Sequence, residues 1–144
     1  MDLSPLIEKR VEALLEASRK VFLESPLALR AAILYGSSLG PGFRSDSDID
    51  IAVLDDAQAP LGWREQAQLM DQLERSLKRG VDLRILRDGS PSHRLHALQQ
   101  GLVIWERQPG DLDRYLSEVL PESQAAHERT TQEWPHTLHR LAGR

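Results

Sequence analysis

Two strand-like apolar runs, joined by a segment rich in glycine and serine, constrain the fold of this 144-residue chain most. The first run ends directly before Gly36 and Ser37, and the second contains Asp48 and Asp50. Because side chains alternate across a strand, both aspartates share one face of the second run. Apolar residues occupy the opposite face: Ile49, Ile51 and Val53. The pattern predicts a buried strand that carries two carboxylates on one side, close to a tight turn.

The turn after the first run exposes backbone N–H groups and the hydroxyl of Ser37, which suit the oxygens of a phosphate. Asp48 and Asp50 are expected to stand roughly 7 Å apart along their strand face. Carboxylate oxygens are the ligands that Mg²⁺ prefers. A phosphate-binding turn beside two carboxylates therefore favours a magnesium–nucleotide site.

A third carboxylate, Asp82, lies in the next strand-like run, between apolar neighbours. If this run pairs with the strand of Asp48 and Asp50, about 4.8 Å away, all three carboxylates lie near one another. Three such ligands can hold two Mg²⁺ ions about 3.5–4 Å apart, an arrangement suited to in-line displacement at phosphorus. The sequence thus predicts phosphoryl or nucleotidyl transfer.

Two other interpretations of these residues are weaker. Asp46, Asp48 and Asp50 imitate the first three ligands of a calcium-binding loop, but Ile51 stands where that loop needs glycine and Ala57 where it needs glutamate.

The histidines His93 and His96 have a spacing that can support a metal, but no glutamate or cysteine ligand stands near them in the pattern of a zinc enzyme. We therefore expect both to be surface residues.

A glycine–serine pair, a gap of ten residues, an Asp-x-Asp element and a downstream Val-Asp-Leu together resemble the nucleotidyltransferase superfamily that includes DNA polymerase beta. Within it, the chain is most similar to the minimal nucleotidyltransferases (MNT, MntA-type), the antitoxin halves of HEPN–MNT toxin–antitoxin pairs. The similarity runs from about Leu29 to Glu106.

The resemblance implies a role for each residue of the motif. Gly36 and Ser37 would hold the triphosphate of ATP, and Asp48 and Asp50 would bind both Mg²⁺ ions. Asp82 would bind one ion and help to deprotonate the acceptor.

The chain departs from the family pattern where members commonly carry arginine after the glycine–serine pair. Position 40 is Gly40, so a basic residue that could neutralise the triphosphate is missing there. Arg44 lies closer in sequence to the aspartates, and we expect it to substitute as a nucleotide-binding residue.

The predicted fold class is α/β (α+β): a small mixed β-sheet nucleotidyltransferase fold flanked by helices, with a helical C-terminal tail. We expect a minimal nucleotidyltransferase domain over residues 1–107 and a helical extension over residues 108–144. The expected helices and strands are listed by range: a helix from Ser4 to Pro26, strands 28–35 and 48–55, a helix 63–78, a strand 81–86, a helix 90–100 and a strand 102–106. Several apolar residues of the extension have two open roles, in the core or on a partner surface: Leu112, Tyr115, Leu116 and Val119.

Composition excludes several other classes of protein. Of the residues, 40% are apolar, enough for one core in a chain of this length. Cysteine is absent, which excludes disulfides and zinc–thiolate sites and predicts a cytoplasmic protein. The net charge of −4 gives no general attraction for nucleic acid, and no apolar run is long enough to span a membrane. We therefore expect neither direct nucleic-acid binding nor a membrane location.

The resemblance implies an antitoxin of a type VII-like pair, which moves AMP from ATP to a tyrosine of a HEPN ribonuclease toxin. The chain has little sequence left over for an acceptor-binding domain, so an acceptor presented by a partner protein is favoured. Two alternatives remain open. One is a non-catalytic antitoxin that acts by contact, and the other is a nucleotidyltransferase that modifies small molecules.

Overall fold

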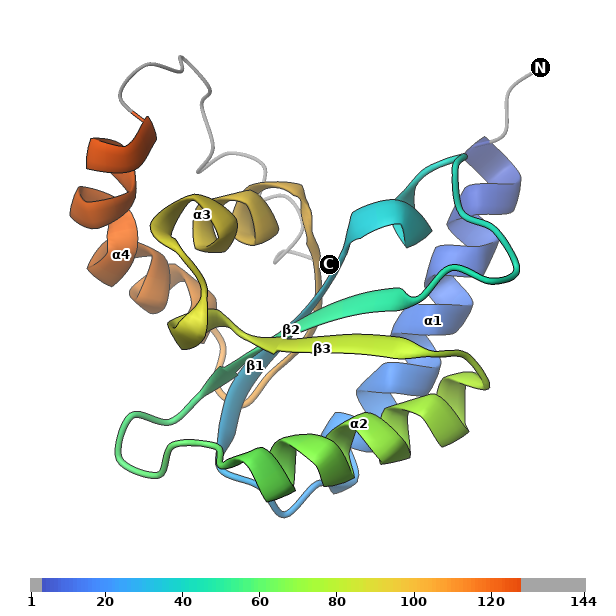
Figure 1. The fold of residues 1–144 in the computed structure, drawn as a ribbon, viewed down its shortest axis with the longest axis horizontal. Coiled ribbons are helices and arrows are strands. Elements are labelled where there is room, and N and C mark those ends of the chain that lie inside the picture. The colour runs from blue at the N-terminus through green and yellow to red at the C-terminus, as the bar shows by residue number, and fades with distance from the viewer. Residues whose placement is uncertain (1–3, 128–144) are drawn as a thin grey trace.

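A four-stranded mixed β-sheet with helices on both faces forms the centre of the molecule (Figure 1). The computed structural model describes residues 4–127. Its helices are α1 (Ser4–Glu24), α2 (Trp63–Leu77), α3 (Pro91–Gln100) and α4 (Asp111–His127). Its strands are β1 (Leu29–Tyr35), β2 (Ile49–Asp55), β3 (Val81–Ile85) and β4 (Leu102–Glu106), and two short 3₁₀ turns are η1 (Gly36–Leu39) and η2 (Leu86–Asp88). The predicted mixed sheet flanked by helices is confirmed.

The strands are arranged in the order β3-β2-β1-β4. The central strand β1 pairs antiparallel with both β2 and β4, whereas β2 and β3 run parallel. Parallel strands need a crossover connection, and α2 provides it here. Because β3 is an edge strand, no neighbouring strand of the sheet pairs with its outer side.

The helix boundaries follow from local chemistry. Ser90 accepts a hydrogen bond from the backbone N–H of His93 (3.1 Å), and Pro91 occupies the first turn of α3. Both features favour a helix start. Lys78 adopts the left-handed conformation (φ 56°) that ends α2. The described elements up to β4 begin and end within about two residues of their expected positions.

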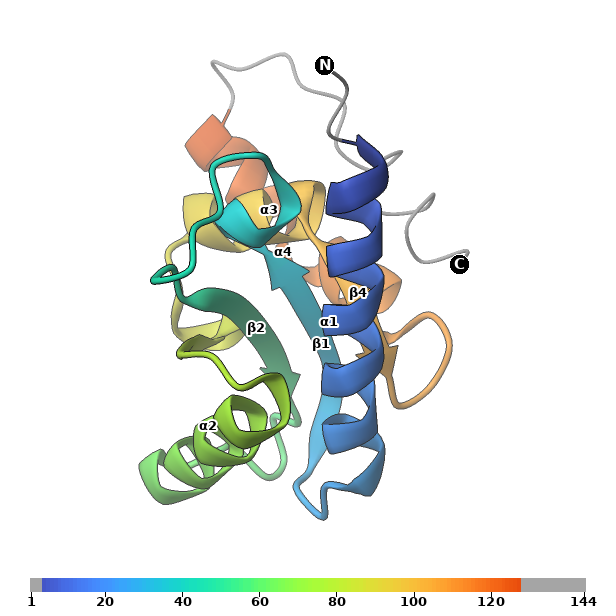
Figure 2. The same ribbon diagram turned by 90° about the vertical axis from the view of Figure 1, so that its right-hand side faces the viewer.

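The two faces of the sheet belong to two separate apolar clusters. In Figure 1, α1 and α2 lie on one side of the sheet and α3 and α4 on the other. Figure 2 shows α1 running along its face of the sheet beside β1 and β4. On that side Phe22 stacks on Trp105 with ring centroids 6.1 Å apart. The same cluster contains the apolar face of β2 that the sequence predicts: Ile49, Ile51 and Val53. Asp50, which alternates with these residues, therefore faces the side of α3 and α4.

Helix α4 packs against the sheet rather than projecting from it. Four apolar side chains in its first half are buried in the cluster beneath α3: Leu112, Tyr115, Leu116 and Val119. Of the two roles left open for these residues, which can coexist, core packing is confirmed and a partner surface stays a prediction. The remainder of the expected extension, residues 128–144, lies outside the described residues.

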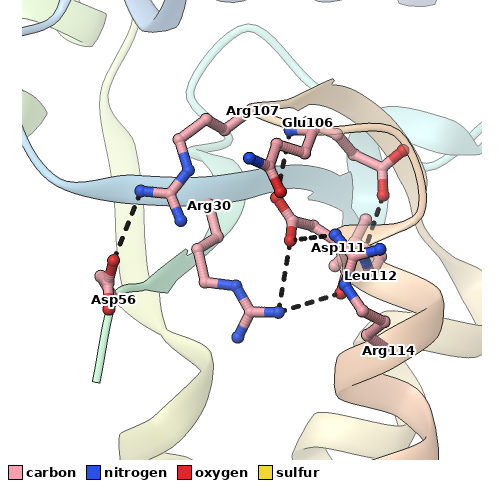
Figure 3. Close-up of polar contacts among 8 residues, drawn as sticks. Arg30, Asp56, Glu106, Arg107, Asp111, Leu112 and Arg114 are labelled. Atoms are coloured by element: carbon pink, nitrogen blue, oxygen red, sulfur yellow. Dashed lines mark hydrogen bonds and ion pairs between the residues drawn. The ribbon is translucent and has the colours of Figure 1, made fainter. Parts of the chain in front are cut away.

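A polar network anchors the start of α4 to β1 and β4 (Figure 3). The buried carboxylate of Asp111 accepts hydrogen bonds from Arg114 (2.6 Å), from the backbone N–H of Gln108 (3.1 Å) and from Arg30 (3.4 Å). Burial by itself would raise the pKa of Asp111, but these hydrogen bonds and the charges of Arg30 and Arg114 bring it below its ordinary value. The network fixes the direction in which α4 leaves the sheet.

Asp111→Ala should lower the free energy of unfolding by about 2–4 kcal/mol, because Arg30 and a backbone N–H lose a buried partner. Since the pKa of Asp111 is lowered on folding, its stabilisation is present above the ordinary value of 3.8 and is lost as the pH falls through the lowered value. Urea unfolding at neutral and acidic pH measures both effects.

The matched control is Asp71→Ala, which removes an exposed carboxylate paired with Arg75 (3.1 Å) and should change stability by less than about 1 kcal/mol. Equal losses for the two variants would contradict an anchoring role for Asp111.

In the part of the chain that the structure covers, no helix combines the length and the apolar character needed to cross a bilayer.

Candidate active site

Three side chains form a row across neighbouring strands of the sheet. Tyr35 of β1 lies opposite Asp50 of β2, and Asp50 lies opposite Asp82 of β3. Directly paired residues share a face, so these three side chains point to the same side. Asp48 precedes β2 by one residue and belongs to the same face by alternation. The predicted pairing of the strands that carry Asp50 and Asp82 is confirmed.

Two glycines make room for the carboxylates. Gly36 has φ 81°, and a Cβ at this position would overlap the carboxylate of Asp50. A Cβ at Gly80 would likewise overlap the carboxylate of Asp48. The turn of Gly36 and Ser37, which forms η1, therefore lies directly against the Asp50 side chain. Four of the expected site residues therefore lie where β1 ends and β2 begins: Gly36, Ser37, Asp48 and Asp50.

The loop between η1 and β2 is held by two arginines from distant parts of the chain. Arg10 of α1 donates hydrogen bonds to the carbonyl oxygen of Ser38 in η1 (2.8 Å) and to that of Gly40 in the loop (2.7 Å). Arg79 donates one to the carbonyl oxygen of Ser47 (3.0 Å). Both guanidinium groups lie over the ring of Phe43, at 4.9 and 4.3 Å from its centroid. These contacts fix the loop between the expected phosphate-binding turn and the aspartates.

Arg44 has a different environment from the one expected. Its side chain is 79% exposed, and its Nε lies 3.8 Å from a carboxylate oxygen of Asp46. Within residues 4–127, the structure gives Arg44 no hydrogen bond or ion pair to the three aspartates of the motif. The structure therefore does not place the side chain of Arg44 beside the other predicted site residues.

Arg84 is the cation that lies among the carboxylates. Its Nε stands 3.4 Å from Asp82 Oδ2, and both side chains are partly exposed. The sequence contained one signal for it: Arg84 follows Asp82 by two residues in a strand and so shares its face. Sequence reasoning considered only the acidic residue of this pair.

The charge distribution at the centre of the row is unfavourable for a carboxylate. Burial, and then the negative charge of Asp82, raises the pKa of Asp50, with a further increase from Asp48 and a partly opposing effect from Arg84. Negative charge is therefore concentrated at this place without a matching buried cation among the described residues. A divalent cation or a cationic donor would relieve it.

Tyr35 and His93 form a pair beside the carboxylates. The hydroxyl of Tyr35 lies 3.3 Å from His93 Nε2, and the two rings meet edge to face with centroids 5.8 Å apart. Burial and the charge of Asp50 raise the pKa of Tyr35 to about 12. Burial and the charge of Arg84 lower the pKa of His93. Both groups are thus neutral near pH 7.

The expectation that His93 is a surface residue is wrong, because α3 folds back over the sheet and half-buries its ring. His96, one turn further along α3, is exposed as expected.

The donor set fits a magnesium ion that is completed by its substrate. Asp48, Asp50 and Asp82 offer only hard oxygen atoms, and the raised pKa of Asp50 marks a local excess of negative charge. Within the described residues, no three acidic, histidine or cysteine side chains are gathered closely enough to hold a metal by themselves. Mg²⁺ does not need such a cage, because it commonly binds through one or two carboxylates together with substrate phosphates and water.

Asp50→Asn should raise the thermal stability of the metal-free protein at neutral pH. A carboxyl whose pKa is raised on folding costs folding free energy once the pH exceeds that raised value, since the ionised form is disfavoured in the folded state. Below the ordinary value of 3.8 the carboxyl is protonated in both states, so the gain should vanish there. Thermal unfolding of the wild-type and Asp50→Asn proteins, from neutral pH to below pH 3.8, measures the gain.

Asp71→Asn, on the exposed face of α2, is the control and should give no comparable gain. A thermal unfolding midpoint lower than that of the wild-type protein, for metal-free Asp50→Asn at neutral pH, would contradict this description of the site.

A mixed sheet that places two aspartates beside a glycine–serine turn, with a third on the adjoining strand, defines a nucleotidyltransferase type of site. The family model described as polymerase beta, nucleotidyltransferase matches residues 19–110. The match covers more than half of the chain, and the chain belongs to this family. No curated protein shows significant similarity to the sequence.

Solved toxin–antitoxin structures share the fold. A crystal structure of a toxin–antitoxin with AMP-PNP contains a chain that is 25% identical, with a TM-score of 0.67 over 80% of this chain and 90% of that chain. A chain of an MntA–HepT toxin–antitoxin crystal structure is 23% identical, with a TM-score of 0.64; the match covers 82% of this chain and 91% of that chain.

A third similar chain comes from a complex of tri-AMPylated HEPN toxin from Shewanella oneidensis with MNT antitoxin. It is 23% identical, with a TM-score of 0.59 over 80% of this chain and 91% of that one. Within the family, this chain therefore has the fold found in MNT toxin–antitoxin structures, as the sequence resemblance implied.

Proposed function

We propose that this protein is an MNT-type antitoxin that transfers AMP from ATP to a tyrosine hydroxyl of a HEPN-type toxin in the cytoplasm. The observation that carries the proposal is the row of Asp50 and Asp82 on paired strands beside the turn at Gly36. Membership of the nucleotidyltransferase family supports the reaction class. The partner is suggested by the similar structures, which contain AMP-PNP in one case and an AMPylated HEPN toxin in another.

The turn at the end of β1 is the proposed binding site for the triphosphate. Gly36 brings the backbone against the carboxylate of Asp50, and Ser37 adds a hydroxyl donor. Arg10 and Arg79 act indirectly in this proposal, because they hold the loop that follows the turn. Arg44 is exposed in the middle of that loop, and its proposed contact would be with the outer phosphates.

Asp48, Asp50 and Asp82 are the proposed ligands for two Mg²⁺ ions, which when bound stabilise negative charge on the attacking and leaving oxygens. Asp82 also accepts the proton of the acceptor hydroxyl. The hydroxyl oxygen forms a bond to the α-phosphorus of ATP as the bond from this phosphorus to the bridging oxygen breaks. Pyrophosphate leaves with that electron pair, and the acceptor keeps AMP.

A comparison of ATP labelled on the α-phosphate with ATP labelled on the γ-phosphate tests the reaction class. Incubating the purified toxin–antitoxin pair with Mg²⁺ and ATP labelled on the α-phosphate should label the toxin, whereas ATP labelled on the γ-phosphate should not. The Asp48→Asn antitoxin is the negative control. Labelling from the γ-phosphate would indicate a kinase reaction, and no labelling from either position would contradict the proposed transfer.

A further inference from the structure

A polar cavity of about 560 Å³ borders the free edge of β3, next to the row of carboxylates. Its lining includes Asp82 and Arg84 of β3 and Gln66 of α2. Asp88 of η2 also lines it, together with Ser90 and His93 at the start of α3. The motif residues at the end of β1 are not part of this lining.

The order of groups across the sheet indicates from which side an acceptor can approach the nucleotide. Gly36 and its turn end β1, Asp50 lies on β2, Asp82 lies on β3, and the cavity begins beyond Asp82. An in-line displacement places the attacking oxygen and the leaving pyrophosphate on opposite sides of the phosphorus. With the triphosphate at the Gly36 turn, the attacking oxygen must come from the β3 side.

We infer that this cavity is the acceptor subsite and that it receives a hydroxyl-bearing aromatic side chain presented by the partner protein. The inference rests on the proposed function and adds where the acceptor binds. A hydroxyl that enters the cavity meets Asp82, the group that takes its proton.

The lining suits a flat phenol ring better than a phosphate. The guanidinium of Arg84 is more than half exposed at the wall and can lie against an aromatic face. The carboxylate of Asp88, which is not a proposed metal ligand, disfavours the negative charge of a triphosphate in this cavity. A volume of this size lies within the range of cavities that hold small organic groups.

Part of the β3 edge beside the cavity is already covered by side chains of α2. Gln66 donates a hydrogen bond from Nε2 to the carbonyl oxygen of Leu83 (3.1 Å), and the backbone N–H of Val81 donates one to Glu74 (3.0 Å). A partner segment therefore does not extend the sheet along its whole edge. The subsite takes a side chain, not an added strand.

Filling the cavity tests the inference without changing the aspartates of the motif. Asp88→Trp introduces a large side chain at an exposed position whose ion pair with Arg87 (3.1 Å) contributes little. Gln66→Trp fills the cavity from α2. Asp71→Trp is the matched control, because Asp71 is also an exposed aspartate in an ion pair with arginine but does not line the cavity.

Two quantities are measured for each variant: the dissociation constant of MgATP, and the KM of the co-purifying HEPN partner in AMP transfer. Both cavity variants should raise the partner KM at least about tenfold and leave the MgATP dissociation constant within about twofold of wild type, which also shows that they are folded. Asp71→Trp should change neither quantity.

Weakened MgATP binding in both folded cavity variants would make the cavity a site for the nucleotide base and overturn the inference. An unchanged partner KM in both would overturn it as well. These outcomes leave the proposed function intact, provided that the wild-type protein transfers AMP. No transfer by the wild-type protein overturns the inference together with the proposed function.

Discussion

Asp50→Asn and Asp48→Asn are each expected to reduce AMP transfer by about 10³-fold or more while the fold is retained. Each change removes an anionic ligand at the point where charge develops in the transition state, and such preorganised electrostatic effects are large. Asparagine has nearly the same shape as aspartate, so packing against Gly36 and Gly80 should persist. Labelled-AMP transfer and thermal unfolding of the same preparations measure activity and folding.

Asp71→Asn is the matched control for these variants and should transfer AMP at the wild-type rate, because its carboxylate lies on the exposed face of α2. Full activity in either Asp48→Asn or Asp50→Asn would show that the site lies elsewhere. Loss of activity together with loss of the folded state would leave the electrostatic argument without support from that variant, so the unfolding measurement decides how the activity is interpreted.

Asp82→Asn is expected to slow the chemical step by about 10²-fold or more and to leave the affinity for ATP nearly unchanged. Its proposed role, to accept the proton of the attacking hydroxyl, matters mainly in the transition state. Ser37→Ala should have the opposite effect: a higher KM for ATP with a smaller change in kcat, because it removes a donor to the bound triphosphate. Single-turnover rates and nucleotide titrations separate the two, and equal losses of ATP affinity would contradict this division of roles.

The sheet and the row of carboxylates could be predicted from the sequence because both depend on short-range periodicity. Alternation along β2 assigns Asp50 to one face and Ile51 to the other, and the structure has this arrangement. Ser90, Pro91 and Gly101 predict the limits of α3 through local hydrogen bonding and proline geometry, and these limits are found.

The supporting residues of the site could not be predicted, because they come from distant elements. Arg10 reaches the carbonyl of Ser38 from α1, 28 residues away, and His93 reaches Tyr35 across 58 residues. No local spacing indicates such contacts. The two histidines of α3 illustrate the difference, since His93 is half-buried and His96 is exposed, although they stand only three residues apart.

The environment of α4 was ambiguous in the sequence for a related reason. An amphipathic helix needs an apolar partner, but its pattern does not say whether that partner is its own core or another protein. The network around Asp111, with Arg30 from β1, settles the direction of α4 and places Leu112 in the core. The expected role of Arg44 had no comparable structural support, since its side chain is exposed beside Asp46.

The central claim is tested most directly by intact-mass spectrometry of the HEPN partner after incubation with MgATP and this protein. The account predicts that the partner gains the mass of one or more AMP units, that the wild-type antitoxin thereby blocks its ribonuclease activity, and that Asp48→Asn produces no gain. A partner that gains no mass, yet is still inhibited, would contradict the account and favour an antitoxin that acts by contact alone. Transfer of AMP to a small molecule in the absence of any partner would contradict both antitoxin interpretations, the catalytic one and the one that acts by contact.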